Sequence, residues 1–361
     1  MVRLASVALL ILLTALPVTG QAGPPGAQAD DPPRVHFVGT GGTISNRTGG
    51  RLTVNELVEL VPDLGDFARV ESEQFANVSS SRMTLDQWLQ LSHRVNEIFA
   101  QDPDLAGVVV TSGTDTLEET AYFLHLTVRS ERPVVVVGAM RNASTLGYEG
   151  AANLRQAFRV AAAPQSRGKG VLVVLNDEIN SAREVTKTDA RRLHTFQSRG
   201  YGVLGIVDRD GPVYYRSLLR RHTHRSEFDL AGVTALPRVD IVMVYQGASG
   251  DLIEAAADAG ARAIVIASAG AGAMSPEQSP AQTYAQERGV FVVVSTRTGS
   301  GRITPTFVPS PDEELTDAQR LRIGYRVAAQ DLTPLKARIL MMLALTETDD
   351  VSEIRRMFAE Y

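Results

Sequence analysis

Four segments of the chain gather side chains that could bind or attack a small polar substrate. They read TGGTI at residues 40–44, TSGTDT at 111–116, GAMR at 138–141, and NDE with AREVTKT between residues 176 and 188. Each segment follows a short apolar run that we expect to form a strand, and two of them are rich in threonine. A hydroxyl group can attack a carbonyl carbon when a base or a proton relay activates it. The pattern therefore indicates a polar ligand site with hydroxyl nucleophiles at hand.

Each of these segments also has a purely structural interpretation. The two glycines before Thr43 could form only a tight turn, and Thr43 itself could cap a helix. Thr114 or Asp115 could cap the helix that follows them, and Lys187 could be a solvated helix residue. The stretch GTGGTI lacks the last glycine of the dinucleotide-binding pattern, so we expect no dinucleotide site there.

The composition excludes several classes of site. The chain has no cysteine, which rules out disulfides, thiolate metal sites and a cysteine nucleophile. Its six histidines form no H-E-x-x-H motif, so we expect no metal. The net charge is −5, without the basic excess of a nucleic-acid groove. We therefore expect a small-molecule substrate, with neither nucleic acid nor membrane as a partner.

The segments must be positioned by strands and helices that alternate along the chain. Short β-branched runs predict strands at Val35–Gly39, Gly107–Thr111, Pro133–Gly138 and Val171–Leu175. Between them, apolar spacing predicts helices at Val54–Val61, Thr84–Ala100, Thr116–Val128 and Gly150–Ala163. This alternation is typical of a parallel sheet that is covered by helices on both faces. Ligands of such sheets bind outside the carboxyl ends of the strands, where the four segments lie.

A change of pattern after residue 208 predicts two α/β domains. Residues 34–208 predict a larger N-terminal domain, with a parallel-rich sheet flanked by helices. Residues 239–361 predict a smaller C-terminal α/β domain, and the Gly-, Pro- and Arg-containing stretch 209–238 an interdomain linker. In the smaller domain we expect strands at 240–244, 263–267 and 290–295, with helices at 252–259, 280–288 and beyond 316.

Residues 1–33 are expected to stand outside the fold. Arg3 precedes the uncharged run Val7–Leu16, which is shorter than the roughly 20 residues that span a bilayer. Pro17, Gly20 and further small residues follow, as in a secretory signal peptide with a flexible lead-in. A single N-terminal anchor helix is the alternative. We favour cleavage, and therefore a periplasmic or secreted protein.

Taken together, the motifs resemble those of the bacterial-type L-asparaginase/glutaminase family. The resemblance lies in the order and spacing of TGGTI, TSGTDTLEETA at 111–121, VVVGAMR at 135–141 and NDEINSAREVTKT at 176–188. The stretch LTPLKARILMMLALT at 332–346 is similar to the terminal region of that family. The resemblance covers nearly all of the chain after residue 34. The succession of TGGTI, GTDT-x-EETA and VTKT is highly specific.

This resemblance implies a catalytic role for four residues. Thr43 corresponds to the nucleophilic threonine, whereas Thr114, Asp115 and Lys187 correspond to a second threonine, an aspartate and a lysine. Such a relay is chemically sound, because desolvation or a nearby cation lowers the pKa of a lysine and a carboxylate orients it. The implied reaction forms a β-aspartyl ester on Thr43, which water then hydrolyses. It needs no metal and no organic cofactor.

The resemblance also implies a set of substrate-binding groups. Asp115 is expected to meet the α-ammonium group of the substrate, and the N–H groups of Gly42 and Thr114 to stabilise an oxyanion. Ser80 and Ser81 fall in the segment that binds substrate. Family members of this kind are tetramers built from dimers, so we expect a homotetramer.

Several positions depart from the family pattern. A tyrosine usually lies on the loop after the first threonine, but here Arg47 stands at that place in a shortened loop. Ser81 replaces a glutamine and Ser112 a histidine, and the asparagine that a neighbouring subunit usually contributes is replaced near Gln246-Gly247. We expect Arg47 or Thr48 to supply the hydrogen bond of the missing tyrosine. The alternative is a site that is open to larger amides and for which asparagine is a poor substrate. A guanidinium has no acceptor, so Arg47 could stabilise charge but could not act as a base.

The sequence therefore predicts an amidohydrolase that converts L-asparagine to L-aspartate and ammonia. One alternative is an enzyme with the same threonines that acts on L-glutamine or another small amide. An alternative of another class is a periplasmic amino-acid-binding protein whose lobes close on a ligand without reaction. A binding protein has no need of two hydroxyls and a lysine relay, which is why we favour the enzyme.

Overall fold

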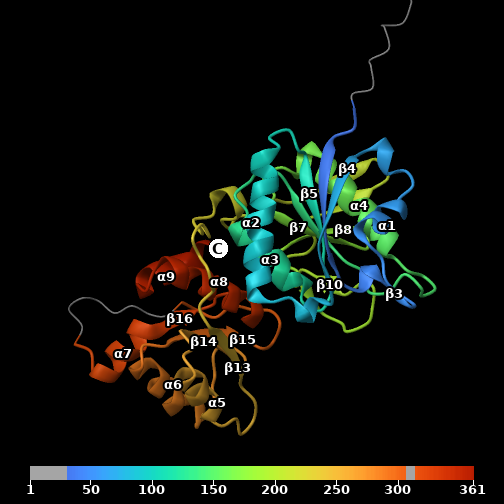
Figure 1. The fold of residues 1–361 in the computed structure, drawn as a ribbon. Coiled ribbons are helices and arrows are strands. Elements are labelled where there is room, and N and C mark those ends of the chain that lie inside the picture. Colours follow the sequence, from blue (N-terminus) through green and yellow to red (C-terminus); the bar gives the residue numbers. More distant parts are fainter. Residues whose placement is uncertain (1–30, 306–313) are drawn as a thin grey trace, which may run out of the picture. The chain divides into compact units, whose positions relative to one another are not determined.

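The computed structural model describes residues 31–305 and 314–361 (Figure 1). Its larger sheet has eight strands in the order β12-β11-β8-β7-β6-β5-β1-β4. In chain order these strands are β1 (Arg34–Gly41), β4 (Arg69–Val78), β5 (Gly107–Thr111), β6 (Val134–Val137), β7 (Val171–Leu175), β8 (Glu178–Ser181), β11 (Gly205–Asp208) and β12 (Gly211–Tyr214). The expected signal peptide and most of its lead-in lie outside the described residues.

The position of β1 in the larger sheet decides where the candidate residues meet. Strands β4, β1, β5, β6 and β7 are parallel, whereas β8, β11 and β12 join antiparallel at the far edge. The chain runs from β1 to β4 on one side, and then to β5 on the other side of β1. This reversal of strand order leaves a crevice at the carboxyl ends, where α/β proteins bind ligands. The segments that follow β4, β1 and β5 are therefore neighbours.

Helices cover both faces of the larger sheet, as the sequence predicts. On one face, Val35 and Phe37 of β1 pack with Leu57 of α1 (Val54–Glu59) and Phe158 of α4 (Gly150–Ala162). On the other face, α2 (Leu85–Gln101) and α3 (Leu117–Thr127) pack against the alternate side chains of the strands. Thr84 caps α2 and accepts a hydrogen bond from the N–H of Gln87, which confirms the expected start of this helix.

The smaller sheet is parallel and has the order β13-β14-β15-β16. Its strands are β13 (Val239–Met243), β14 (Ala263–Ser268), β15 (Phe291–Thr296) and β16 (Arg326–Ala328). Helices α5 (Asp251–Asp258) and α6 (Gln278–Glu287) cover one face, and α7 (Asp317–Tyr325) precedes β16. The chain ends in α8 (Pro334–Glu347) and α9 (Val351–Glu360). The expected α/β class, with a larger parallel-rich sheet and a smaller one, is confirmed.

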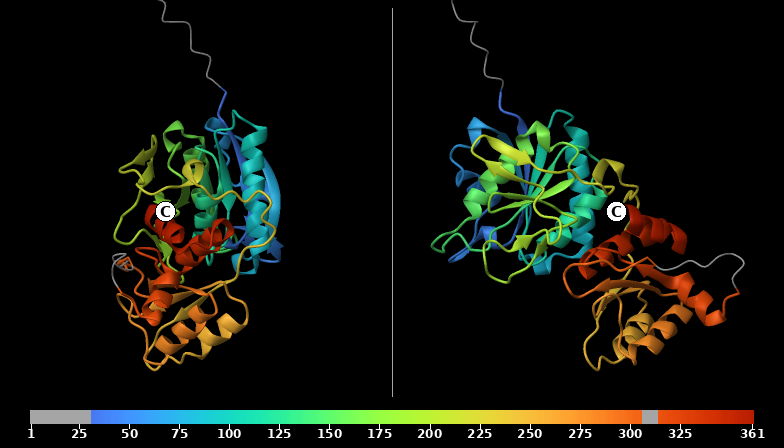
Figure 2. Two further views of the ribbon diagram at one scale, coloured as in Figure 1. Left: turned by 90° about the vertical axis from the view of Figure 1, so that its left-hand side faces the viewer. Right: turned by 180° about the vertical axis from the view of Figure 1, so that it is seen from behind.

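A shared core joins the two sheets. Helix α8 contacts β13, β14 and β15 on one side and α3 on the other, and Figures 1 and 2 show it between the two sheets. Its apolar residues belong to the same buried cluster as Trp88 of α2 and Tyr122 of α3. Residues Pro32–Tyr361 accordingly form one compact unit. This contact matters below, because α8 also reaches the segment that carries Lys187.

Several strands lie where the sequence pattern predicts none: β4, β8, β11 and β12 in the larger sheet, and β16 in the smaller one. β4 reads RVESEQFANV, and the sequence pattern places no strand there. It is an edge strand that pairs only with β1, so polar side chains are tolerated and the apolar run that marks a buried strand is missing. β12 lies within residues 209–238, the stretch expected as a linker, and extends the larger sheet instead.

Within the described residues, no helix is both long and apolar enough to cross a membrane.

Candidate active site

Lys187 joins the second threonine to the neighbouring aspartate. Its Nζ donates hydrogen bonds to Thr114 Oγ1 at 3.1 Å and to Asp115 Oδ1 at 2.7 Å. The Lys187 side chain is 14% exposed and that of Asp115 is 74% exposed, so the carboxylate bridges the buried ammonium and the solvent. The N-cap of α3 is Thr116, with no side-chain capping bond. Thr114 and Asp115 therefore accept hydrogen bonds from Lys187 and do not cap the helix.

Buried polar groups hold Lys187 in place. Lys187 lies on β9 (Thr186–Lys187), which pairs with β10 (Phe196–Gln197), so it is not a solvated helix residue. Glu118, buried on α3, accepts hydrogen bonds from Thr186 Oγ1 at 2.9 Å and from the Lys187 N–H at 3.1 Å. Glu118 lies within the segment TSGTDTLEETA, but no feature of the sequence marks it as the partner of the chain around Lys187.

A second buried lysine supports the same segment from α8. Lys336 Nζ donates to the backbone carbonyls of Arg183 at 2.8 Å and Val185 at 2.5 Å. Burial lowers the pKa of Lys336 to about 8, since desolvation disfavours the charged form. Helix α8 thus fixes the chain just before β9. No sequence signal marks this contact, because it joins residues about 150 positions apart in the chain.

The first threonine follows a backbone that only glycine can supply. Gly42 has φ +91°, in the region that disfavours other residues, and a Cβ there would collide with the backbone of Gly113. The glycine before Thr43 therefore contacts the glycine before Thr114. A Cβ on Gly113 would in turn lie 2.8 Å from Ser80 Oγ. The three loops after β1, β5 and β4 meet at these glycines, as the strand order requires.

One expectation about Gly42 is wrong. Its N–H donates to the carbonyl of Val78 at 2.9 Å, so it is not available to stabilise an oxyanion. In the described part of the chain, the N–H groups of Thr43 and Thr114 make no hydrogen bond. Strand order explains the error: Gly42 lies beside β4, an unexpected strand whose carbonyl takes up this N–H.

Thr43 is half-buried and begins a short 3-10 helix, Thr43–Ser45. The N-cap of this helix is Gly42, so Thr43 is not a capping residue. Its hydroxyl makes no hydrogen bond to any residue that the structure describes. A pair of bonds between Thr40 and Thr111, at 3.0 and 2.5 Å, aligns the ends of β1 and β5 just before the two loops.

The two serines after β4 are not equivalent. Ser80 is buried at the contact with Gly113, which brings it to the site. Ser81 is exposed and makes no hydrogen bond to the cluster in residues 31–305 and 314–361. The structure thus groups Thr43, Ser80, Thr114, Asp115 and Lys187, with Ser81 outside the group.

The shortened loop after Thr43 forms a small hairpin of β2 (Asn46–Arg47) and β3 (Gly50–Arg51). Arg47 Nη1 pairs with Glu56 Oε1 of α1 at 2.9 Å. Neither Arg47 nor Thr48 makes a hydrogen bond to Thr43 in the described residues, contrary to expectation. Instead, the hydroxyl of Tyr148 donates to the Ile44 carbonyl at 2.7 Å. Tyr148 lies seven residues past the GAMR segment, outside the motifs that the sequence pattern marks.

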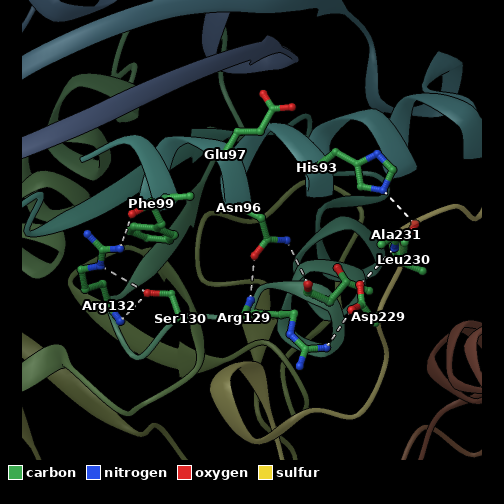
Figure 3. A pocket seen from close by; sticks show the side chains of 12 residues that line it. His93, Asn96, Glu97, Phe99, Arg129, Ser130, Arg132, Asp229, Leu230 and Ala231 are labelled. Atoms are coloured by element: carbon green, nitrogen blue, oxygen red, sulfur yellow. Dashed lines mark hydrogen bonds and ion pairs between the residues drawn. The ribbon is translucent and has the colours of Figure 1, made fainter. Parts of the chain in front are cut away.

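A cavity of about 650 Å³ lies elsewhere, between α2 and residues 229–231 (Figure 3). Several of its polar side chains are paired with one another or with backbone. Asn96 accepts from the N–H of Arg129 at 2.8 Å, and Arg132 donates to the Phe99 carbonyl at 2.6 Å. None of the grouped residues lines this cavity, so it is separate from the candidate active site. Among the described residues, no cluster of His, Asp and Glu is arranged to hold a metal ion.

The fold and this cluster define an α/β protein with a threonine, lysine and aspartate site at a sheet edge, and comparisons with known proteins name its family. The model of the N-terminal asparaginase domain matches residues 34–220, and that of the glutaminase/asparaginase C-terminal domain matches residues 238–358. The chain therefore belongs to the asparaginase/glutaminase family.

Individual relatives cover nearly the whole chain. It is 41% identical to "L-asparaginase 2" of Bacillus subtilis, over 93% of this chain and 88% of the relative. It is 38% identical to "Glutaminase-asparaginase" of Pseudomonas fluorescens, over 91% and 90%. A crystal structure named "Probable Cytoplasmic L-asparaginase from Campylobacter jejuni" superposes with a TM-score of 0.81 at 36% identity, covering 91% of this chain and all of that one. These comparisons confirm the family and the fold that the motifs predict.

Proposed function

We propose that the protein hydrolyses L-asparagine to L-aspartate and ammonia, with Thr43 as the nucleophile. The observation that carries this proposal is the contact of Lys187 Nζ with both Thr114 Oγ1 and Asp115 Oδ1, next to the loop of Thr43. Names and family of the relatives support the same activity.

In the proposed reaction, the Thr43 hydroxyl attacks the side-chain amide carbon of the substrate. Its proton passes to the Thr114–Lys187–Asp115 relay and from there to the amide nitrogen, which departs as ammonia. Water then attacks the β-aspartyl ester and releases aspartate. The free N–H groups of Thr43 and Thr114 are the candidate donors to the oxyanion. The exposed carboxylate of Asp115 receives the α-ammonium group, and Ser80 borders the substrate.

Ammonia release from L-asparagine by the purified protein, with L-glutamine in parallel, tests the proposal. We expect release from asparagine, and none from the Thr43→Ala variant, whose fold should persist because this loop residue is only half-buried. Thr43→Ser should retain part of the rate, since the hydroxyl survives. A faster reaction with glutamine would favour a glutaminase, in line with the relative named glutaminase-asparaginase. Binding of asparagine without ammonia release would identify an amino-acid-binding protein instead.

We also propose that the protein is exported and forms a homotetramer. Export is supported by the charged residue, short apolar run and small residues of positions 1–20. The tetramer is supported by the family alone. Amino-terminal sequencing of the protein from a periplasmic or culture fraction tests the first point: a start well after residue 20 is expected, and an intact Met1 would contradict cleavage. Light scattering coupled to size exclusion tests the second, and a monomer would contradict it.

A further inference from the structure

The loop after β6 binds the loop that carries Thr43 through three hydrogen bonds. The Tyr148 hydroxyl donates to the Ile44 carbonyl at 2.7 Å, the Ala143 N–H donates to the Asn46 carbonyl at 2.8 Å, and the Thr48 N–H donates to Ser144 Oγ at 2.8 Å. Only the first of these comes from a large side chain, and it ends on the residue directly after Thr43.

The surroundings of Tyr148 suit a fixed donor. The side chain is half-buried, and burial, with the neighbouring Glu149, raises its pKa above the ordinary value. The hydroxyl therefore keeps its proton at neutral pH and donates it to the carbonyl. It cannot accept a proton as a phenolate base, so its contribution has to come from position.

Gly150 leaves room for the ring of Tyr148. A Cβ at position 150 would collide with the phenol oxygen and with two ring carbons of Tyr148. Gly150 is the first residue of α4, where an alanine would favour the helix and not disturb it. The missing side chain at this position therefore serves the tyrosine and not the helix.

We propose that Tyr148 is a positioning residue for the nucleophile. Its hydroxyl fixes the peptide group after Ile44, and with it the backbone of the short helix Thr43–Ser45. The hydroxyl of Thr43 has no partner of its own in the described residues, so the direction from which it meets a substrate depends on this backbone. A displaced nucleophile loses rate more than affinity, because alignment is needed in the transition state. The inference rests on the proposed function.

The Tyr148→Phe variant removes the hydroxyl and leaves the ring. Since one neutral hydrogen bond is lost, we expect kcat for asparagine to fall about three- to tenfold, with KM changed less than about twofold. Tyr214→Phe is the matched control: Tyr214 is half-buried on β12, at the opposite edge of the sheet from β4, and its hydroxyl donates to Ser166 Oγ at 2.7 Å. It should leave kcat unchanged.

Gly150→Ala tests the same contact without a substitution of the tyrosine itself. The added methyl group pushes the ring away from Ile44, so kcat should fall as in Tyr148→Phe. The kcat of the double variant Gly150→Ala with Tyr148→Phe should lie within about twofold of the kcat of either single variant, since both substitutions remove the same contact. Fully multiplicative losses would show that the two residues act separately and would overturn the inference.

Hydrogen exchange of the peptide covering residues 42–52 supplies a readout that needs no substrate. We expect faster exchange in Tyr148→Phe and in Gly150→Ala, but not in Tyr214→Phe. Faster exchange with an unchanged kcat would overturn the positioning role. Unchanged exchange would overturn it as well, because it would show that the hydrogen bond to the Ile44 carbonyl does not stabilise the loop in solution. A wild-type protein that released no ammonia from either amide would overturn the proposed function, and the exchange result would still decide whether Tyr148 holds the loop.

Discussion

The two threonines of the site are held in opposite ways. The hydroxyl of Thr114 accepts a hydrogen bond from Lys187, which also binds Asp115 and lies on a strand fixed by Glu118. The hydroxyl of Thr43 makes no hydrogen bond in the described chain. Next to Thr43, the loop is held through the backbone of its neighbours, by Val78 at Gly42 and by Tyr148 at Ile44.

This difference matches the two tasks of the proposed mechanism. A proton relay depends on short and constant distances between its groups, which a hydrogen-bonded cluster supplies. A nucleophile must be free to turn toward the carbonyl carbon and to remain esterified until water arrives. The loop of Thr43 meets the requirement for a nucleophile, because its backbone is fixed while the Thr43 hydroxyl is free to turn. Variants on each side of the comparison should therefore fail in different ways.

The largest effect is expected at the centre of the fixed cluster. Lys187→Met removes the ammonium at similar volume, and turnover of asparagine should fall on the order of a hundredfold to ten-thousandfold. KM should change much less. The chain has three lysines, Lys169, Lys187 and Lys336, and Lys169 serves as the control, because it lies over the ring of Tyr214. Lys169→Met should keep the wild-type rate. A Lys187→Met enzyme with the wild-type kcat would break the comparison.

The Asp115→Ala variant should affect binding as well as turnover. The exposed carboxylate is the proposed anchor of the α-ammonium group, and a charged hydrogen bond of this kind contributes about 1.5–3 kcal/mol. We therefore expect KM to rise about tenfold to a hundredfold, together with a lower kcat, in steady-state measurements of ammonia release. Equal effects of Asp115→Ala and Lys187→Met on KM would contradict this division of roles.

Lys336→Met tests whether α8 supports the fixed cluster. It removes the donor to two buried carbonyls, and we expect a loss of about 1–3 kcal/mol in unfolding free energy and a several-fold lower kcat. The pH dependence gives a separate signature. The pKa of Lys336 is lowered to about 8 in the folded protein, so between pH 8 and the unfolded value of about 10.4 the unfolded chain binds the extra proton.

Stability contributed by this lysine therefore rises as the pH increases through that window. Urea unfolding at pH 7 and pH 10 should show that wild type gains stability relative to Lys336→Met, by up to about 3 kcal/mol. A constant difference between the two proteins at both pH values would show that Lys336 is not desolvated in the way that its contacts indicate.

The smallest effect is expected at Arg47. Its ion pair with Glu56 is half-exposed, and such surface pairs contribute about 0–1 kcal/mol. Arg47→Ala should leave kcat and KM for asparagine within about twofold of wild type, with a small loss of stability by urea unfolding. A large loss of turnover would mean that Arg47 reaches the site after all, and that the Thr43 loop depends on more than its backbone contacts.

The sequence predicted much of the frame of this site. β-branched runs located β5 and β7 at their observed bounds, because buried parallel strands must be apolar throughout. Because these strands are parallel, the sequence also predicts that the loops after β1 and β5 lie at the same end of the sheet, beside the carboxyl ends of the strands. The segments TGGTI and TSGTDT needed no structure to be recognised as neighbours.

The contacts that the sequence did not predict all depend on the third dimension. β4 has polar residues because it lies at a sheet edge, and its carbonyl at Val78 takes the N–H that Gly42 was expected to offer. Lys336 and Tyr148 are far in sequence from the segments of Lys187 and Thr43 that they contact, and they reach these segments only through the packing of α8 and of the loop after β6. Local patterns carry no signal for such contacts.

The central claim is that Thr43, and not Thr114, carries the acyl group. Rapid acid quenching of wild-type protein with L-asparagine, followed by peptide mass spectrometry, tests it most directly. The claim predicts a mass increase of one aspartyl group on the peptide that contains Thr43, and its absence in Thr43→Ala. The same increase on the peptide that contains Thr114 would contradict it.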